Sequence, residues 1–179
     1  MNSLKYLIQF LIILFLFFIF KILGLKLSTI VSSKIFRYIG PFFRSKKLIE
    51  KNILKGIPNL SLLEVKEITN KMWENYGRIF SEYVFIKEFR NSKLNDNLQI
   101  TGQEILDKIR DEKEPVIFIS GHFNNFELMA MHIEKSGINL ATIYRPLNNK
   151  FLNFLMEKIR KKYICKIISL YKTPFKIYK

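Results

Sequence analysis

His122 and Glu127 are the two residues of this chain whose types and spacing best suit chemistry. A carboxylate that holds one ring nitrogen fixes the tautomer of an imidazole, and the other nitrogen can then take a proton from a hydroxyl group. A separation of five positions is too long for one helical face, so it suits a histidine on a loop and a carboxylate reaching back from the following helix. The sequence indicates no serine or cysteine nucleophile. The pair therefore predicts a general base that activates an acceptor hydroxyl for direct attack.

The apolar pattern places the elements that must position this pair. Residues 116–119 form a short apolar run, as expected for a strand buried on both faces of a parallel sheet. Further strands are expected at 140–144 and 166–169, and helices at 125–135 and 148–162. This order is a βαβαβ unit, so the predicted fold class is α/β. His122 would then lie at the carboxyl end of the first strand, where open α/β sheets bind ligands. Glu127 would lie in or near the first turn of the following helix, where the dipole favours a carboxylate.

The chain before residue 98 is predicted to be mostly helical. Between residues 61 and 89 apolar side chains recur at spacings of three and four, which predicts one long amphipathic helix or two helices. Ser61 and Glu64 stand in capping-box positions at its start. A possible strand at 98–101 and a short helix at 103–112 follow.

Residues 6–25 are apolar except for Gln9 and Lys21, which is about the length that a helix needs to cross a bilayer. A signal peptide is the alternative, but no small-residue cleavage site follows, so an uncleaved transmembrane anchor at 1–25 is predicted. Basic residues after the segment greatly outnumber those before it, which predicts a single-pass protein with residues 26–179 in the cytoplasm. Residues 27–43 fit either an interfacial helix or an amphipathic helix on the domain's own core.

The net charge of +15, from 30 basic and 15 acidic residues, indicates an anionic partner or surface. The excess lies at the two ends of the chain. Nucleic acid is the weakest of the possible partners, because no recognition helix, zinc ligand set or ribonucleoprotein motif accompanies the charge. Cys165 is the only cysteine and is expected to be a buried apolar filler. His132 is interpreted as structural or exposed, and no metal site or cofactor is predicted.

Several stretches of the chain resemble the bacterial lipid A biosynthesis acyltransferases, the late lauroyl or myristoyl acyltransferase family. Residues 121–128 resemble the family's catalytic motif of a His, four residues and an acid, and Tyr144-Arg145-Pro146-Leu147-Asn148-Asn149 is similar to its second conserved segment. Residues 73–78 and 100–102 are also similar, in collinear order. Asn124 and Phe126 stand where the family commonly has Gly and Trp.

The end of the chain departs from this pattern. Family members continue with a further segment that contains an Asp-Gln pair and more sheet, and residues 171–179 match it poorly. The acyltransferase domain, mostly helical over 26–97 and α/β over 98–179, is therefore expected to be C-terminally truncated and incomplete.

The resemblance implies transfer of a fatty acyl group from acyl-carrier protein to a hydroxyl of a lipid A precursor, at the cytoplasmic face of the bacterial inner membrane. His122 would be the general base and Glu127 would orient it. Arg145 would bind a phosphate or carboxylate of the substrates, or else form a surface salt bridge. Asn125, Asn148 and Asn149 are candidates for substrate contacts or helix caps. The basic run at 158–162 could receive the acidic carrier protein or the precursor's phosphates, or be a solvated helix face.

Two other interpretations stay open. A glycerolipid acyltransferase of the same superfamily would typically carry Asp in place of Glu127, and the Tyr-Arg-Pro segment favours the lipid A type. A catalytically inactive membrane-bound remnant is the other, and the expected truncation favours it.

Overall fold

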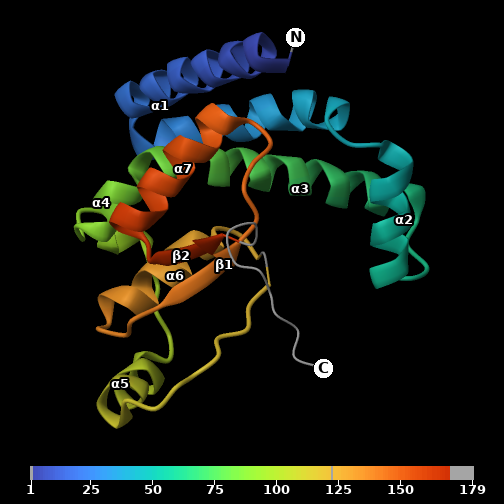
Figure 1. Ribbon diagram of the computed structural model, residues 1–179. Coiled ribbons are helices and arrows are strands. Elements are labelled where there is room, and N and C mark those ends of the chain that lie inside the picture. The colour runs from blue at the N-terminus through green and yellow to red at the C-terminus, as the bar shows by residue number, and fades with distance from the viewer. Residues whose placement is uncertain (1, 122, 170–179) are drawn as a thin grey trace, which may run out of the picture. The chain divides into compact units, whose positions relative to one another are not determined.

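The computed structural model of the protein describes residues 2–121 and 123–169 (Figure 1). Its contacts divide the chain into two compact units, one formed by Met1–Phe15 with Ile86–Lys179 and the other by Leu16–Phe85. The predicted boundary between an anchor at 1–25 and a domain at 26–179 concerns membrane attachment, and it stays a prediction.

Helix α1 (Asn2–Ile39) contains the apolar N-terminal run. Its backbone leaves the helical conformation at Gly24, whose φ of 73° favours glycine because it has no Cβ. A segment from Ser3 to Phe42 is long and apolar enough to cross a membrane, and it is the single such segment among the described residues. The predicted apolar helix is therefore confirmed, and a second helical part follows the break and ends at Ile39.

The unit of residues 16–85 is helical, with an aromatic cluster around Phe80. The ring of Phe80 lies 5.2 Å from that of Phe17 and 6.2 Å from that of Phe20, both before the break at Gly24. It also lies 5.2 Å from the ring of Phe36, which follows the break. The two parts of α1 thus pack on the same side chain of helix α3 (Leu62–Glu82). The contact of Phe36 agrees with a helix that packs on its own domain.

Helix α3 begins at the predicted capping box. The Ser61 hydroxyl accepts a hydrogen bond from the Glu64 backbone N–H, and the Glu64 carboxylate accepts one from the Ser61 backbone N–H at 2.8 Å. At Gly77 an added Cβ would lie only 2.4 Å from the carbonyl oxygen of Ser32, so a glycine is needed where α3 passes this backbone. The remaining elements of this unit are η1 (Gly40–Phe42), α2 (Lys46–Gly56) and η2 (Tyr83–Phe85).

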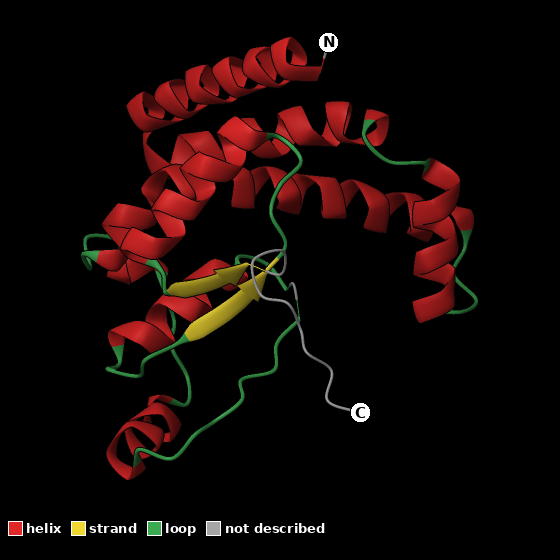
Figure 2. Ribbon diagram, viewed as in Figure 1, coloured by secondary structure: helices red, strands yellow, loops and turns green. Residues whose placement is uncertain are grey.

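The other unit holds the α/β part, drawn by element type in Figure 2. Its elements are α4 (Ile86–Arg90), η3 (Asn95–Asn97), α5 (Gln103–Glu112), α6 (Phe126–Lys135), β1 (Ala141–Tyr144), α7 (Lys150–Tyr163) and β2 (Lys166–Ser169). β1 and β2 pair in parallel, with Ala141 opposite Lys166 and Tyr144 opposite Ser169. Helix α7 is the crossover between them. The last two strands, the two helices near them and the helix at 103–112 are therefore confirmed within one or two residues.

Two predicted strands are wrong. Residues 116–119 and 98–101 form no strand, and Ile117 and Ile119 are 88% and 94% exposed. The physical reason is that a strand needs a neighbour for its N–H and C=O groups, and in the described sheet β1 and β2 pair only with each other. An apolar run specifies a strand only where a partner exists. Within the described residues the fold is mostly helical with one βαβ unit, a partial α/β architecture.

Candidate functional site

Glu127 lies in the first turn of α6 and is 5% exposed. Burial of a carboxylate is costly unless charge and hydrogen bonds compensate it, and the N-terminal end of a helix contributes part of that compensation. Asn125 occupies the N-cap position just before, where it is buried and makes no side-chain capping hydrogen bond. His122, the predicted partner of Glu127, lies outside the described residues.

Arg160 supplies the main positive charge at Glu127. Its Nε donates to Glu127 Oε1 at 2.8 Å, and its Nη2 donates to the same oxygen. The two side chains are 18% and 7% exposed, so this ion pair is largely removed from water and its attraction is weakly screened. Sequence reasoning missed this residue, which it grouped only with the basic run at 158–162. No local signal could have found it, because 33 positions separate the partners.

Arg160 also contacts the end of strand β1. Its guanidinium carbon lies 5.4 Å from the centre of the Tyr144 ring, within the range of a cation–π contact. The Tyr144 hydroxyl donates to Glu157 and lies 3.1 Å from Asn153 Oδ1, which accepts a hydrogen bond from the Leu147 backbone N–H at 2.9 Å. The Tyr144 hydroxyl, more than any other group, lowers the pKa of Glu157 to about 2, while burial raises the pKa of Tyr144. Asn153, Glu157 and Arg160 of α7 therefore hold both the end of β1 and the segment after it.

That segment carries the remaining predicted site residues. Asn149 caps α7, since its Oδ1 accepts from the N–H groups of Phe151 at 3.1 Å and Leu152 at 3.3 Å. The capping interpretation of Asn149 is thereby confirmed. Asn148 and Arg145 are exposed, and among the described residues neither has an ion-pair or side-chain hydrogen-bond partner. Arg145 is thus presented to solvent directly after β1.

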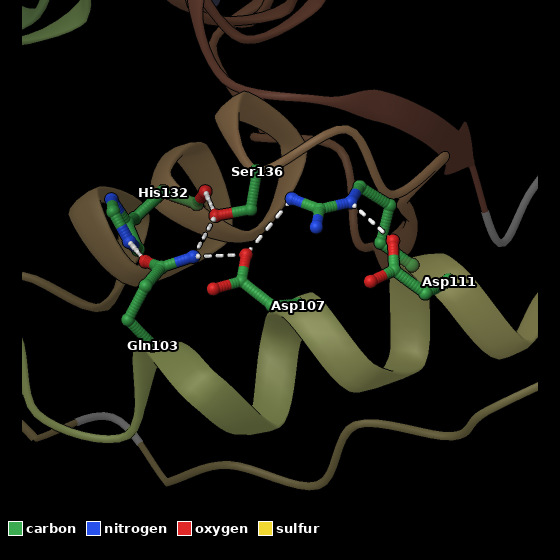
Figure 3. A network of polar contacts seen from close by, with 6 residues as sticks. Gln103, Asp107, Asp111, His132 and Ser136 are labelled. Carbon is green, nitrogen blue, oxygen red and sulfur yellow. Dashed lines mark hydrogen bonds and ion pairs between the residues drawn. The ribbon is translucent and has the colours of Figure 1, made fainter.

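Cys165 and His132 lie in structural settings. Cys165 is 5% exposed, its Sγ lies 3.5 Å from the Thr142 hydroxyl, and burial raises its thiol pKa, so it is a poor nucleophile. His132 Nε2 lies 2.6 Å from Gln103 Oε1, in a polar network that joins α5 to α6 (Figure 3). Burial, and then the charge of Lys135, lowers the pKa of His132. Among the described residues no group of three or more His, Cys, Asp or Glu side chains could hold a metal ion.

Comparison with protein families decides the class of this site. The model of the bacterial lipid A biosynthesis acyltransferases matches residues 1–173. The chain belongs to this family. No curated protein and no solved structure shows a significant match to it.

Membership in the bacterial lipid A biosynthesis acyltransferase family confirms the resemblance carried by residues 121–128 and 144–149. It supports acyl transfer in lipid A biosynthesis as the class of function. The match covers α1 as well as the α/β part, so the long apolar helix belongs to the family pattern. The match does not reveal a truncation, and the expectation of a C-terminally incomplete fold stays a prediction.

Proposed function

We propose that this chain transfers a fatty acyl group from acyl-carrier protein to a hydroxyl of a lipid A precursor, with His122 as general base and Glu127 as the residue that orients it. The observation that carries this proposal is the burial of Glu127 against Arg160, five residues after His122 in the family motif. A guanidinium beside Glu127 and the positive end of the helix dipole give this position surroundings that suit a carboxylate. A carboxylate can accept the N–H of an imidazole and stabilise its protonated state.

The reaction balances with these groups alone. The acceptor hydroxyl loses its proton to His122 as its oxygen attacks the carbonyl carbon of the acyl thioester. The tetrahedral intermediate then breaks its carbon–sulfur bond, and the imidazolium returns the proton to the departing thiolate of the carrier. The products are an ester on the lipid and the free carrier thiol. No covalent acyl-enzyme is needed, which agrees with the buried, weakly nucleophilic Cys165.

Arg160 acts through Glu127 and is therefore a positioning residue. Two of its hydrogen bonds go to Oε1 of Glu127, so it holds that oxygen in place. A carboxylate has a second oxygen, and acceptance from an imidazole at that atom is compatible with the guanidinium at Oε1. Arg145 is proposed to bind a phosphate of the acceptor, because it is exposed at the carboxyl end of β1 and a guanidinium matches phosphate geometry.

The proposed location is the cytoplasmic side of the bacterial inner membrane. Residues 1–60 carry ten basic side chains and one acidic one, a balance that favours the anionic cytoplasmic leaflet. Attachment through α1 would keep the α/β part close to a lipid acceptor. The acyl-carrier donor comes from solution, and the basic run at 158–162 offers charge complementary to an acidic protein.

An acyl-transfer assay tests the proposal. Membranes from cells that express the chain are supplied with acyl-carrier protein loaded with fatty acid and with a lipid A precursor, and the gain of one acyl group is followed by mass spectrometry. We expect His122→Ala to lower the rate by about 100-fold or more, because general base catalysis typically contributes that much. Glu127→Gln should lower kcat with little change in KM, since the amide keeps the shape but not the charge.

Lys108→Ala is the matched control, because Lys108 is exposed on α5 and, among the described residues, pairs only with Glu112 of the same helix. It should leave the rate unchanged. Equal background in the wild type and His122→Ala would support the inactive remnant. Transfer to a lysoglycerophospholipid and not to the lipid A precursor would support the glycerolipid acyltransferase.

A further inference from the structure

Arg145 and Pro146 form a short segment whose own chemistry leaves it few conformations. The proline ring holds φ near about −65°, and it restricts the residue before it to extended conformations. Strand β1 ends at Tyr144, directly before this segment. Arg145 is exposed and Pro146 is partly buried. The direction in which the segment leaves the strand is therefore set by the residues that hold its two ends.

Asn153 on α7 contacts the chain on both sides of Arg145 and Pro146. Its Oδ1 accepts a hydrogen bond from the Leu147 backbone N–H at 2.9 Å, the first backbone N–H after the proline. The same oxygen lies 3.1 Å from the Tyr144 hydroxyl. Because one oxygen atom contacts both ends of the segment, the two ends cannot move apart without losing one of these contacts.

Glu157 completes this arrangement from the next turn of α7. Asn153 Nδ2 donates to Glu157 Oε1 at 2.9 Å, and the Tyr144 hydroxyl donates to the same oxygen. Residues four positions apart lie on one face of a helix, so both polar side chains point toward the strand end. Tyr144 is 8% exposed, so water competes little for its hydroxyl. Tyr144, Asn153 and Glu157 thus form a closed set of hydrogen bonds, called the clamp below.

The clamp is joined to the proposed catalytic acid through Arg160. The guanidinium carbon of Arg160 lies 5.4 Å from the centre of the Tyr144 ring, and its Nε donates to Glu127 Oε1 at 2.8 Å. All of these contacts lie within the compact unit of residues 1–15 and 86–179. Helix α7 therefore holds both the backbone next to Arg145 and the carboxylate of Glu127.

We propose that Asn153 is a positioning residue that directs Arg145 toward a phosphate of the acceptor, at a fixed place relative to Glu127. This inference rests on the proposed role of Arg145 in binding that phosphate. A guanidinium binds phosphate best through two parallel hydrogen bonds, so its backbone must arrive in a defined direction. A segment that is already held in that direction loses little conformational entropy on binding. Asn153 therefore contributes to acceptor affinity by acting through Arg145.

Acceptor kinetics test this role in the full-length chain, with the acceptor and the acyl-carrier donor varied in turn. We expect Asn153→Ala to raise the KM of the acceptor about threefold to tenfold, because the loosened segment must be ordered on binding. The kcat and the KM of the donor should not change. With an acceptor from which the phosphate has been removed, wild type and variant should have the same KM. Asn139→Ala is the matched control, because Asn139 is exposed in the loop between α6 and β1. A lower kcat with an unchanged acceptor KM would show a merely structural residue and overturn the proposal.

An exchange of donor and acceptor keeps the test decisive if Asn153→Ala folds poorly. In the double variant Asn153→Asp with Glu157→Gln, the carboxylate at position 153 still accepts from the Leu147 backbone N–H. The amide at position 157 donates to that carboxylate and accepts from the Tyr144 hydroxyl. Net charge and side-chain size are kept, so the acceptor KM should return to the wild-type value. Asn153→Asp alone places two carboxylates side by side and should raise the acceptor KM. A double variant that melts like the wild type but keeps a raised acceptor KM would overturn the proposal.

Arg145→Ala separates this inference from the function on which it rests. It should raise the acceptor KM about tenfold, as loss of a hydrogen bond to a charged group typically does. Adding Asn153→Ala should then change the KM little further, because both substitutions act on one contact. If Arg145→Ala leaves the KM unchanged, the proposed role of Arg145 fails and the positioning role falls with it. If Arg145→Ala raises the KM and Asn153→Ala does not, only the positioning role fails. Calorimetric binding of the acceptor in detergent micelles, without donor, should show the same changes in Kd, so the test does not depend on turnover.

Discussion

The two ends of helix α6 both carry acidic side chains paired with arginine, but in different surroundings. At the N-terminal end, Glu127 and Arg160 have side chains that are 7% and 18% exposed. At the C-terminal end, Glu134 and Arg90 are 35% and 28% exposed. The same chemical pair is therefore a buried charge couple at one end and a partly solvated one at the other. Loss of a partner should be costly only where water cannot replace it.

Removal of Arg160 gives the largest expected effect. Arg160→Met keeps most of the side-chain volume but leaves the Glu127 carboxylate buried without its main counter-charge. We expect a loss of about 3–5 kcal/mol in the free energy of unfolding. Urea unfolding in detergent micelles, followed by circular dichroism, measures it.

The double variant Glu127→Gln with Arg160→Met is the control for this comparison. It removes both charges, so it should recover a large part of the lost stability. Arg160→Lys should be intermediate, because it keeps the charge but not the planar fork. An Arg160→Met chain that unfolds at the wild-type urea concentration would show that the two ends of α6 do not differ.

Removal of Arg90 gives a smaller effect. Arg90→Met leaves Glu134, which water can still reach, so we expect a change of at most about 1 kcal/mol in the free energy of unfolding. The same urea titration measures it, at low and at high salt. The difference between wild type and variant should shrink at high salt, because exposed pairs are screened. A loss as large as that for Arg160→Met would contradict the distinction drawn from exposure.

The two ends also differ in how far the sequence predicted them. Glu127 was expected in or near the first turn of α6, because the apolar pattern begins at that point and Gly137 marks its end. The partner on α7 was not expected, since a pair separated by 33 positions leaves no periodic signal. The contact of Asn149 with Tyr6 could not be predicted for the same reason, because 143 positions separate the two residues. Local sequence patterns therefore predict where most helices begin and end. The contacts between residues far apart in the sequence are known only from the folded structure.

The wrongly predicted strand at 116–119 shows a second limit of prediction from sequence. Four apolar residues in a row are compatible with a buried strand, but burial depends on a neighbour that the run itself does not specify. The predicted strands at 140–144 and 166–169 do have such a neighbour, because helix α7 is a crossover that lets β1 and β2 pair in parallel. The catalytic roles of His122 and Glu127 rest on the family motif together with the chemistry of the pair.

Substitution of His132 should have the smallest effect on the free energy of unfolding, and this effect should depend on pH. Because burial lowers its pKa, the folded state prefers the neutral imidazole, and protons bind more readily to the unfolded chain. The contribution of His132 to stability is therefore complete above its ordinary pKa of 6.5 and is lost as the pH falls from there through the lowered folded value. His132→Gln keeps a donor for Gln103 but cannot titrate, so its stability should depend less on pH below 6.5 than that of the wild type. Thermal unfolding of both chains from pH 7.5 to 5 measures the difference. Parallel curves would mean that His132 keeps its ordinary pKa and that this end of α6 is as solvated as an exposed helix face.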